Sequence, residues 1–263
     1  MVPTISFVAM AVSAVLSVGA PIALFFVARK RYGKGFLPVL VGGLGFLLFA
    51  MVLEQILHAI VLRPGADGSV AFVQQHPYWY MLYGALAAGV FEESARFVSF
   101  HILKRRCDGF GTALKHGVGH GGVEAVLIGG LSLVSGIVLA SMLNRMGAQA
   151  LGSALGVATL QQAQAIAATR PALLLLSGAE RLLALGIQVS LSAVVYYAVY
   201  APRKVWLYPL AILLHALVDV PAALMQAGTL TNVWLVEGIV AAAMAALAVF
   251  AALLHRRLEP KSV

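Results

Sequence analysis

Residues 112–142 read TALKHGVGHGGVEAVLIGGLSLVSGIVLASM, and from Ala125 onward this stretch contains no charged side chain. A helix needs about 20 mostly apolar residues to cross the hydrocarbon core of a bilayer. The stretch is long enough, which predicts a membrane-spanning helix. Its first part is unusual for such a helix because it also carries two histidines, a lysine and a glutamate.

The rest of the chain has the same apolar character. Of its 263 residues, 61% are hydrophobic and 11% are charged, whereas a soluble globular domain has roughly 45–50% apolar and about 25% charged residues. This composition excludes a soluble enzyme and a disordered chain, and the single Cys107 excludes an intramolecular disulfide framework. We expect one all-α integral membrane domain over residues 1–263, a polytopic transmembrane helix bundle. Its seven or so spans are expected at about 5–28, 36–62, 78–103, 112–142, 172–200, 205–227 and 231–255.

One long connection, residues 143–171, separates the fourth and fifth predicted spans. Its mixture of leucine, alanine and glutamine is typical of an amphipathic helix. We expect such a helix to lie on the outer membrane surface, either as a plain surface helix or as a mobile gate.

Lysine and arginine are divided unequally between the two sets of loops that these spans define. One set contains only Arg63, Arg145 and Arg170. The positive-inside rule assigns the other set to the cytoplasm, so we expect the N-terminus outside and the C-terminus in the cytoplasm. The net charge of +8 then reflects membrane topology, and we expect no nucleic-acid partner. We expect a multi-pass protein of the bacterial cytoplasmic (inner) membrane, in contact with membrane lipid. The basic set comprises Arg29, Lys30, Arg31, Lys34, Lys104, Arg105, Arg106, Lys115, Arg203, Lys204, Arg256, Arg257 and Lys261.

Acidic residues are concentrated inside the predicted spans, where a charge costs several kcal/mol and marks a functional site by default. At a rise of about 1.5 Å per residue, Glu93, His120 and His215 lie at similar depths, each roughly 12–15 Å from the predicted inner end of its span. Three helices therefore place polar groups in one slab of the membrane. Seven of the ten acidic residues lie in spans: Glu54, Glu92, Glu93, Glu124, Glu180, Asp219 and Glu237.

Helical spacing also places polar residues on common faces. His116 is nearest the predicted inner end of its span, where water can solvate it. Glycines surround His120 in the segment Gly117–Gly122, and they either form a close helix-packing face or line a wet cavity. Residues separated by four positions share a helix face, and those that do so are His116, His120 and Glu124; Glu92 and Arg96; and His215 and Asp219.

Two kinds of hydrolytic chemistry suit these residues. A glutamate that faces a histidine across a water molecule acts as a general base, and a second histidine beside a carboxylate can donate to a developing oxyanion. Alternatively, histidine and glutamate side chains hold a zinc ion with one open position. The spacing of His116 and His120 is that of helical zinc ligands, and the zinc candidates are His116, His120, Glu124 and His215. The sequence leaves both alternatives open.

The motif Phe91-Glu92-Glu93-Ser94-Ala95-Arg96 resembles the glutamate-pair motif of the type II CAAX prenyl protease and bacteriocin-processing superfamily. His215-Ala216-Leu217-Val218-Asp219 resembles its third motif, and His120 would supply the histidine of its second. The run from His116 to Glu124, together with Glu180-Arg181, resembles more specifically the YhfC family of intramembrane proteases. The resemblance covers roughly residues 36–225, although Asp219 stands where asparagine is common.

This resemblance implies an intramembrane endopeptidase of the glutamate type, with Glu93 as the base and His120 as its partner in holding water. It assigns His215, Asp219, Glu92 and Arg96 to the same catalytic site. We expect supporting roles for Glu124, His116, Glu180 and Arg181. The favoured mechanism needs no cofactor, and the alternative mechanism uses zinc. The expected substrate is a protein or peptide embedded in the membrane or close to it.

Three functions of other classes compete with proteolysis. A non-catalytic membrane scaffold or chaperone subunit would keep the same histidines. An ion-coupled transporter is less well supported because the spans show no inverted halves. A receptor or channel would need an extramembrane module or a filter-like ring of residues, which the sequence does not indicate.

Overall fold

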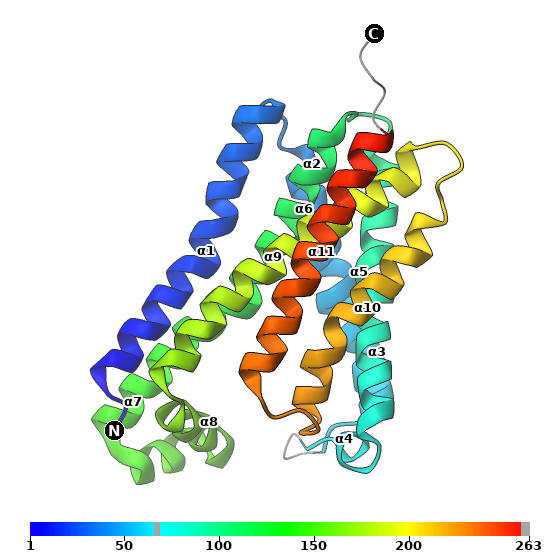
Figure 1. The fold of residues 1–263 in the computed structure, drawn as a ribbon. Coiled ribbons are helices and arrows are strands. Elements are labelled where there is room, and N and C mark those ends of the chain that lie inside the picture. Colours follow the sequence, from blue (N-terminus) through cyan, green and yellow to red (C-terminus); the bar gives the residue numbers. More distant parts are fainter. Residues whose placement is uncertain (66–68, 259–263) are drawn as a thin grey trace. The chain divides into compact units, whose positions relative to one another are not determined.

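The computed structural model describes residues 1–65 and 69–258, and within them every regular element is a helix (Figure 1). The all-α prediction is therefore confirmed for this part of the chain. Lys261 and the C-terminus itself lie outside the described residues. The helices are α1 (Thr4–Tyr32), α2 (Leu37–Leu48), η1 (Phe49–Glu54), α3 (Gln55–Leu62), α4 (Ala71–Gln75), α5 (Pro77–Leu103), α6 (Phe110–Glu124), η2 (Ala125–Leu131), α7 (Ser132–Leu155), α8 (Val157–Ala168), α9 (Pro171–Tyr200), α10 (Leu207–Gln226) and α11 (Val233–Leu258).

Six helical segments in the described part of the chain are long and apolar enough to cross a membrane. The remaining predicted span, 78–103, corresponds to α5, which has 27 residues but carries three charged side chains in its interior. Pro77 at its first position begins this helix, because proline lacks the N–H that the first turn leaves unpaired. The direction in which the chain crosses the membrane stays a prediction. The six segments are Thr4–Tyr32, Leu37–Leu62, Phe110–Leu155, Pro171–Tyr200, Leu207–Gln226 and Val233–Leu258.

The long connection between the fourth and fifth spans is helical, as predicted. It consists of the end of α7 followed by α8, and two glycines break the helical path. Gly147 (φ 78°) bends α7, and Gly156 (φ 86°) separates α7 from α8. Both have a positive φ, which glycine adopts without the steric cost that a side chain would add.

The chain forms two compact units. Unit 1 comprises Met1–Ala23 and Glu124–Leu182, and unit 2 comprises Leu24–Val123 and Leu183–Val263. In unit 1, the amide N–H of Val2 donates to Asn144 Oδ1 at 2.7 Å, which fixes the start of the chain against α7. In unit 2, buried side chains of α9 pack with Phe100 of α5 and Leu207 of α10.

Glycines bring α6 of unit 2 into backbone contact with α2 and α9. A Cβ atom added to Gly119 would lie 2.0 Å from the carbonyl oxygen of Val39 on α2. On the α9 side, a Cβ atom on Gly117 would lie 2.6 Å from Val189 Cα, and one on Gly121 would lie 2.7 Å from Gln188 Cβ. The glycine-rich segment is therefore a close packing face, and its packing fixes the helix that carries His116 and His120.

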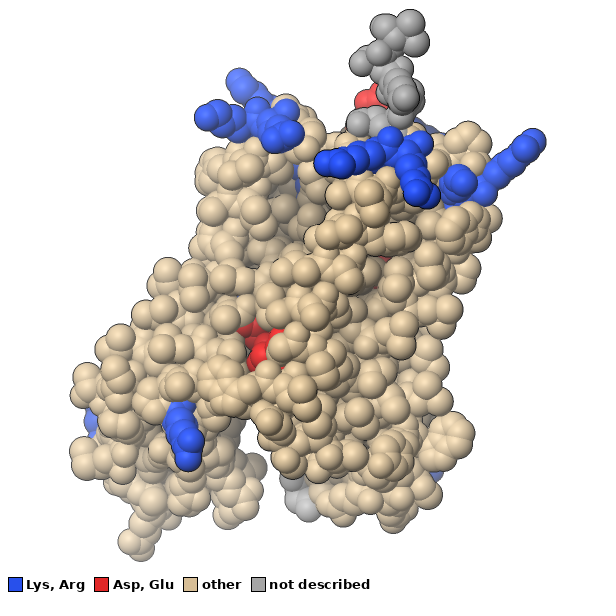
Figure 2. All heavy atoms as spheres, in the orientation of Figure 1, with Lys and Arg blue, Asp and Glu red and all other residues tan. Residues whose placement is uncertain are grey.

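Basic side chains mark one end of unit 2, where α1 and α11 finish (Figure 2). Three basic residues occupy the last turn of α1, and Arg256 and Arg257 occupy that of α11. Lys115 differs from these because it is buried and its Nζ donates to the carbonyl oxygens of Tyr32 and Gly33 at 3.1 and 3.3 Å. This clustering is the feature from which the cytoplasmic side was predicted.

Candidate active site

Helix α5 supplies an acidic pair and its counter-charge. Glu93 and Arg96 are completely buried, and Arg96 Nη1 donates to Glu93 Oε1 at 2.6 Å. Glu92, one residue earlier, has its Oε2 atom 3.5 Å from Arg96 Nη2. The separations of three and four residues place all three side chains on one face of the helix. An arginine is therefore built into the helix beside the acids, which offsets part of the cost of burying them.

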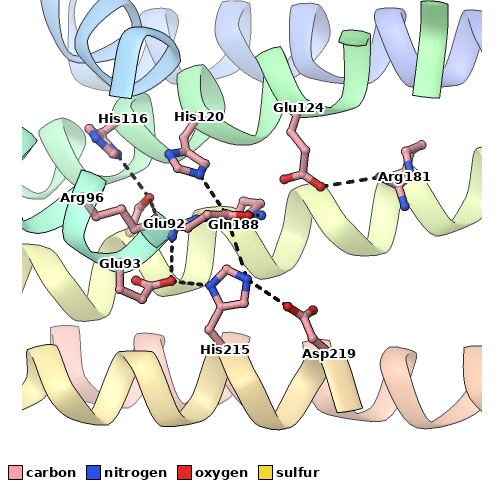
Figure 3. Close-up of polar contacts among 11 residues, drawn as sticks. Glu92, Glu93, Arg96, His116, His120, Glu124, Arg181, Gln188, His215 and Asp219 are labelled. Atoms are coloured by element: carbon pink, nitrogen blue, oxygen red, sulfur yellow. Dashed lines mark hydrogen bonds and ion pairs between the residues drawn. The ribbon is translucent and has the colours of Figure 1, made fainter. Parts of the chain in front are cut away.

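Helix α10 brings His215 to the same point (Figure 3). His215 Nδ1 lies 2.6 Å from Glu93 Oε1, and its Nε2 lies 4.0 Å from Glu92 Oε2 and 3.5 Å from Asp219 Oδ2. The imidazole thus contacts carboxylates from both of its nitrogen atoms. Glu93 Oε1 is fixed by a guanidinium and an imidazole, whereas the buried Oε2 has no hydrogen-bond partner in the described structure.

Helix α6 contributes the two remaining histidines. His120 is buried, its Nε2 lies 3.0 Å from Glu92 Oε2, and the ring of Phe46 packs edge-on against it. His116 was predicted to lie near the inner interface, where water could solvate it, and this solvation is not seen in the structure. It is fully buried between Phe100 and Ser192, with Nδ1 3.3 Å from Ser192 Oγ. The cause is the backbone contact of α6 with its neighbours, which leaves no room for water around this turn.

Two residues of α9 complete the cluster, and neither was predicted from the sequence. Gln188 Nε2 donates to Glu92 Oε2 at 3.0 Å, and Gln188 Oε1 accepts a hydrogen bond from Arg96 Nη2. Ser192 Oγ accepts a hydrogen bond of 3.3 Å from Arg96 Nε. The only sequence signal was that Gln188 and Ser192 are four residues apart and share a helix face; in the structure they lie against Gly121 and Gly117 of α6.

The structure gathers most of the predicted catalytic residues in unit 2. Glu92, Glu93, Arg96, His120 and His215 form one connected network, and Asp219 joins it through His215. In unit 1, Arg181 pairs with Glu180, and its Nη1 atom lies 3.5 Å from Glu124 Oε1. The supporting roles assigned to those three residues stay predictions.

A metal ion was the alternative occupant of this cluster. Imidazole and carboxylate groups are suitable zinc donors. In the described residues, however, no group of three or more histidine, cysteine, aspartate or glutamate side chains is positioned to hold an ion. Glu92 Oε2 already lies within 3.0 Å of both His120 Nε2 and Gln188 Nε2. The cluster thus has the donor types of a zinc site, but its arrangement is that of a hydrogen-bonded network.

The helices and this buried centre define a polytopic helical membrane protein with an internal glutamate–histidine site. A model of the YhfC family, described as an intramembrane metalloprotease, matches residues 13–240. The chain is also 37% identical over 243 residues to the uncharacterized membrane protein YhfC of Bacillus subtilis (strain 168), an alignment covering 92% of this chain and 93% of the relative. The chain belongs to the YhfC family, which confirms the resemblance to that family. No solved structure matches it.

The ion pair between Arg96 and Glu93 yields a stability prediction. Replacing Arg96 with glutamine should leave a buried carboxylate without its cation, which costs about 3–5 kcal/mol. The double variant Glu93→Gln/Arg96→Gln should recover much of that loss because both charges are absent. Denaturant unfolding of the purified protein in detergent measures these differences. Losses that simply add in the double variant would contradict the pairing.

Proposed function

We propose that this protein is an intramembrane protease that hydrolyses peptide bonds in or near the bilayer at the cluster on α5, α6 and α10. The observation that carries the proposal is the state of Glu93. One of its oxygens is fixed by Arg96 and His215, while the other is buried and has no hydrogen-bond partner in the described residues. The family description, which names proteolysis, supports the same reaction class.

Glu93 is the proposed general base. Its Oε2 atom is available to accept a proton from water, and the fixed position of Oε1 holds the carboxylate in place for that step. The resulting hydroxide attacks the peptide carbonyl carbon. Glu93 then returns the proton to the amide nitrogen as the C–N bond breaks, so that water is divided between the two products.

His120 is the proposed partner that holds the water. If its Nε2–H donates to Glu92 Oε2, then Nδ1 is left as a hydrogen-bond acceptor. That Nδ1 atom is buried and has no hydrogen-bond partner in the described structure. Glu92 therefore fixes the orientation and tautomer of His120, and Gln188 fixes Glu92 in turn.

The negative charge that develops on the carbonyl oxygen needs a donor. Glu93 Oε1 holds His215 through Nδ1, and we assign the Nε2–H of His215 to this task, with Asp219 beside it in the site. Arg96 contributes a fixed positive charge from the opposite side of Glu93. The same constellation supports membership of the wider type II CAAX prenyl protease and bacteriocin-processing superfamily.

Replacement of the base tests the proposal. Glu93→Gln should lower cleavage by about 10²–10⁴-fold because the amide cannot accept the proton. Glu237→Gln, which removes a carboxylate from α11 in the same unit, is the matched control and should retain activity. Each purified protein is added with detergent to bacterial membrane vesicles, and the mixture is reconstituted by removing the detergent. New protein N-termini are then quantified by mass spectrometry.

Three outcomes of that experiment separate the candidate functions. New N-termini with the wild type and Glu237→Gln, but not with Glu93→Gln, support the proposed site. Equal products from all three proteins would contradict it. A wild-type protein that is folded but generates no new N-termini would favour the non-catalytic scaffold.

Zinc-dependent hydrolysis at the same site is the second candidate, and the family description favours it. We predict that the purified protein contains far less than one zinc per chain and keeps its activity in 1,10-phenanthroline. Elemental analysis and cleavage assays with and without the chelator measure both quantities. Stoichiometric zinc, with activity lost to the chelator and restored by added zinc, would replace the metal-free mechanism.

A further inference from the structure

A second feature of unit 2 lies outside the glutamate–histidine cluster. A cavity of about 850 Å³ lies at the end of α5, and three basic residues are part of its lining. It has an apolar side and a cationic side. The apolar lining comes from Leu37, Phe97, Val98 and Ile102, and the cationic lining from Lys104, Arg105 and Arg106, with His101 between them.

The cationic side is made by three consecutive basic residues in the turn that closes α5. The amide N–H of Arg106 donates to the Leu103 carbonyl oxygen at 2.8 Å, which tightens the chain and brings the three side chains together. Lys104 Nζ is fixed by a 2.6 Å hydrogen bond to the Val199 carbonyl oxygen. Arg105 and Arg106 are exposed, and neither makes an ion pair with any described residue.

The apolar side continues directly from this turn along α5. Val98 and Ile102 share one helix face, and they are 45% and 60% exposed. Phe97 gives the wall rigidity because its ring stacks on Tyr208 at a centroid distance of 4.4 Å. Among the described residues, no acidic side chain lines the cavity, so its lining presents positive charge beside exposed hydrocarbon.

We infer that this cavity binds an anionic phospholipid. The guanidinium groups of Arg105 and Arg106 suit the phosphodiester, since arginine forms paired hydrogen bonds to phosphate oxygens. The acyl chain would lie along Val98 and Ile102. The apolar wall favours a lipid over a soluble anion. A zwitterionic headgroup also carries an ammonium group, which would need a carboxylate partner. Because no described lining residue is acidic, the site favours an anionic headgroup.

Native mass spectrometry of the purified protein with defined lipids tests the site. Phosphatidylglycerol should be retained in preference to phosphatidylcholine of the same chain length. The double variant Arg105→Gln/Arg106→Gln should weaken retention by on the order of tenfold or more, because each basic residue near a membrane contributes about 1 kcal/mol. The control Arg256→Gln/Arg257→Gln removes equal charge from α11 at the same end and should retain the lipid.

Further arms separate a lipid from a bare anion. Val98→Trp keeps every basic residue but fills the apolar side, and it should also weaken phosphatidylglycerol retention. Glycerol phosphate, which lacks acyl chains, should not displace the lipid at millimolar concentration. The inference would be overturned by equal losses in the two arginine double variants, by equal retention of the two lipids, or by displacement with glycerol phosphate.

Discussion

The active-site architecture depends on the buried carboxylate of Glu93, held between Arg96 and His215. An ionised group within a membrane helix is expensive unless it is paired and its remaining hydrogen bonds are satisfied. Arg96 comes from the same helix as Glu93, whereas His215 comes from α10, and Gln188 of α9 joins Arg96 to Glu92. The Glu93 carboxylate thus joins α5 to α10, and Arg96 and Glu92 extend the network to α9 through Gln188.

The glycine-rich face of α6 serves this network indirectly. Side chains at Gly117, Gly119 or Gly121 would collide with α2 or α9, so only glycine allows α6 to lie this close to them. The same contact excludes water from His116 and places His120 beside Glu92. The position of His120 in the site therefore depends on the close packing of this short segment.

Much of the fold and of the candidate site could be predicted from the sequence. Long apolar stretches predict the membrane spans, and charged residues within those stretches indicate the site. The spacing of Glu92 and Arg96 placed them on one helix face, and the shared depth of Glu93, His120 and His215 placed these side chains in one slab of the membrane. Gln188 and Ser192 escaped prediction because neutral polar residues cost little within a helix and carry no charge signal. Contacts between helices, such as that of His215 with Glu93, depend on helix rotation, which a single sequence does not specify.

Two histidine–glutamate pairs in unit 2 allow the central claim to be tested directly. His120 Nε2 lies 3.0 Å from Glu92 Oε2, and His58 Nε2 lies 3.3 Å from Glu54 Oε1. In the described structure, His58 makes no hydrogen bond or ion pair with a proposed site residue, and its Nδ1 lies 2.8 Å from Tyr83 Oη. The measurement is the peptide-cleavage rate of His120→Gln compared with that of His58→Gln, each as a folded, reconstituted protein. We predict that the cleavage rate of His120→Gln is lower than that of the wild type by about 100-fold or more. The rate of His58→Gln should stay close to that of the wild type. Equal rates in the two variants would contradict the assignment of catalysis to this cluster.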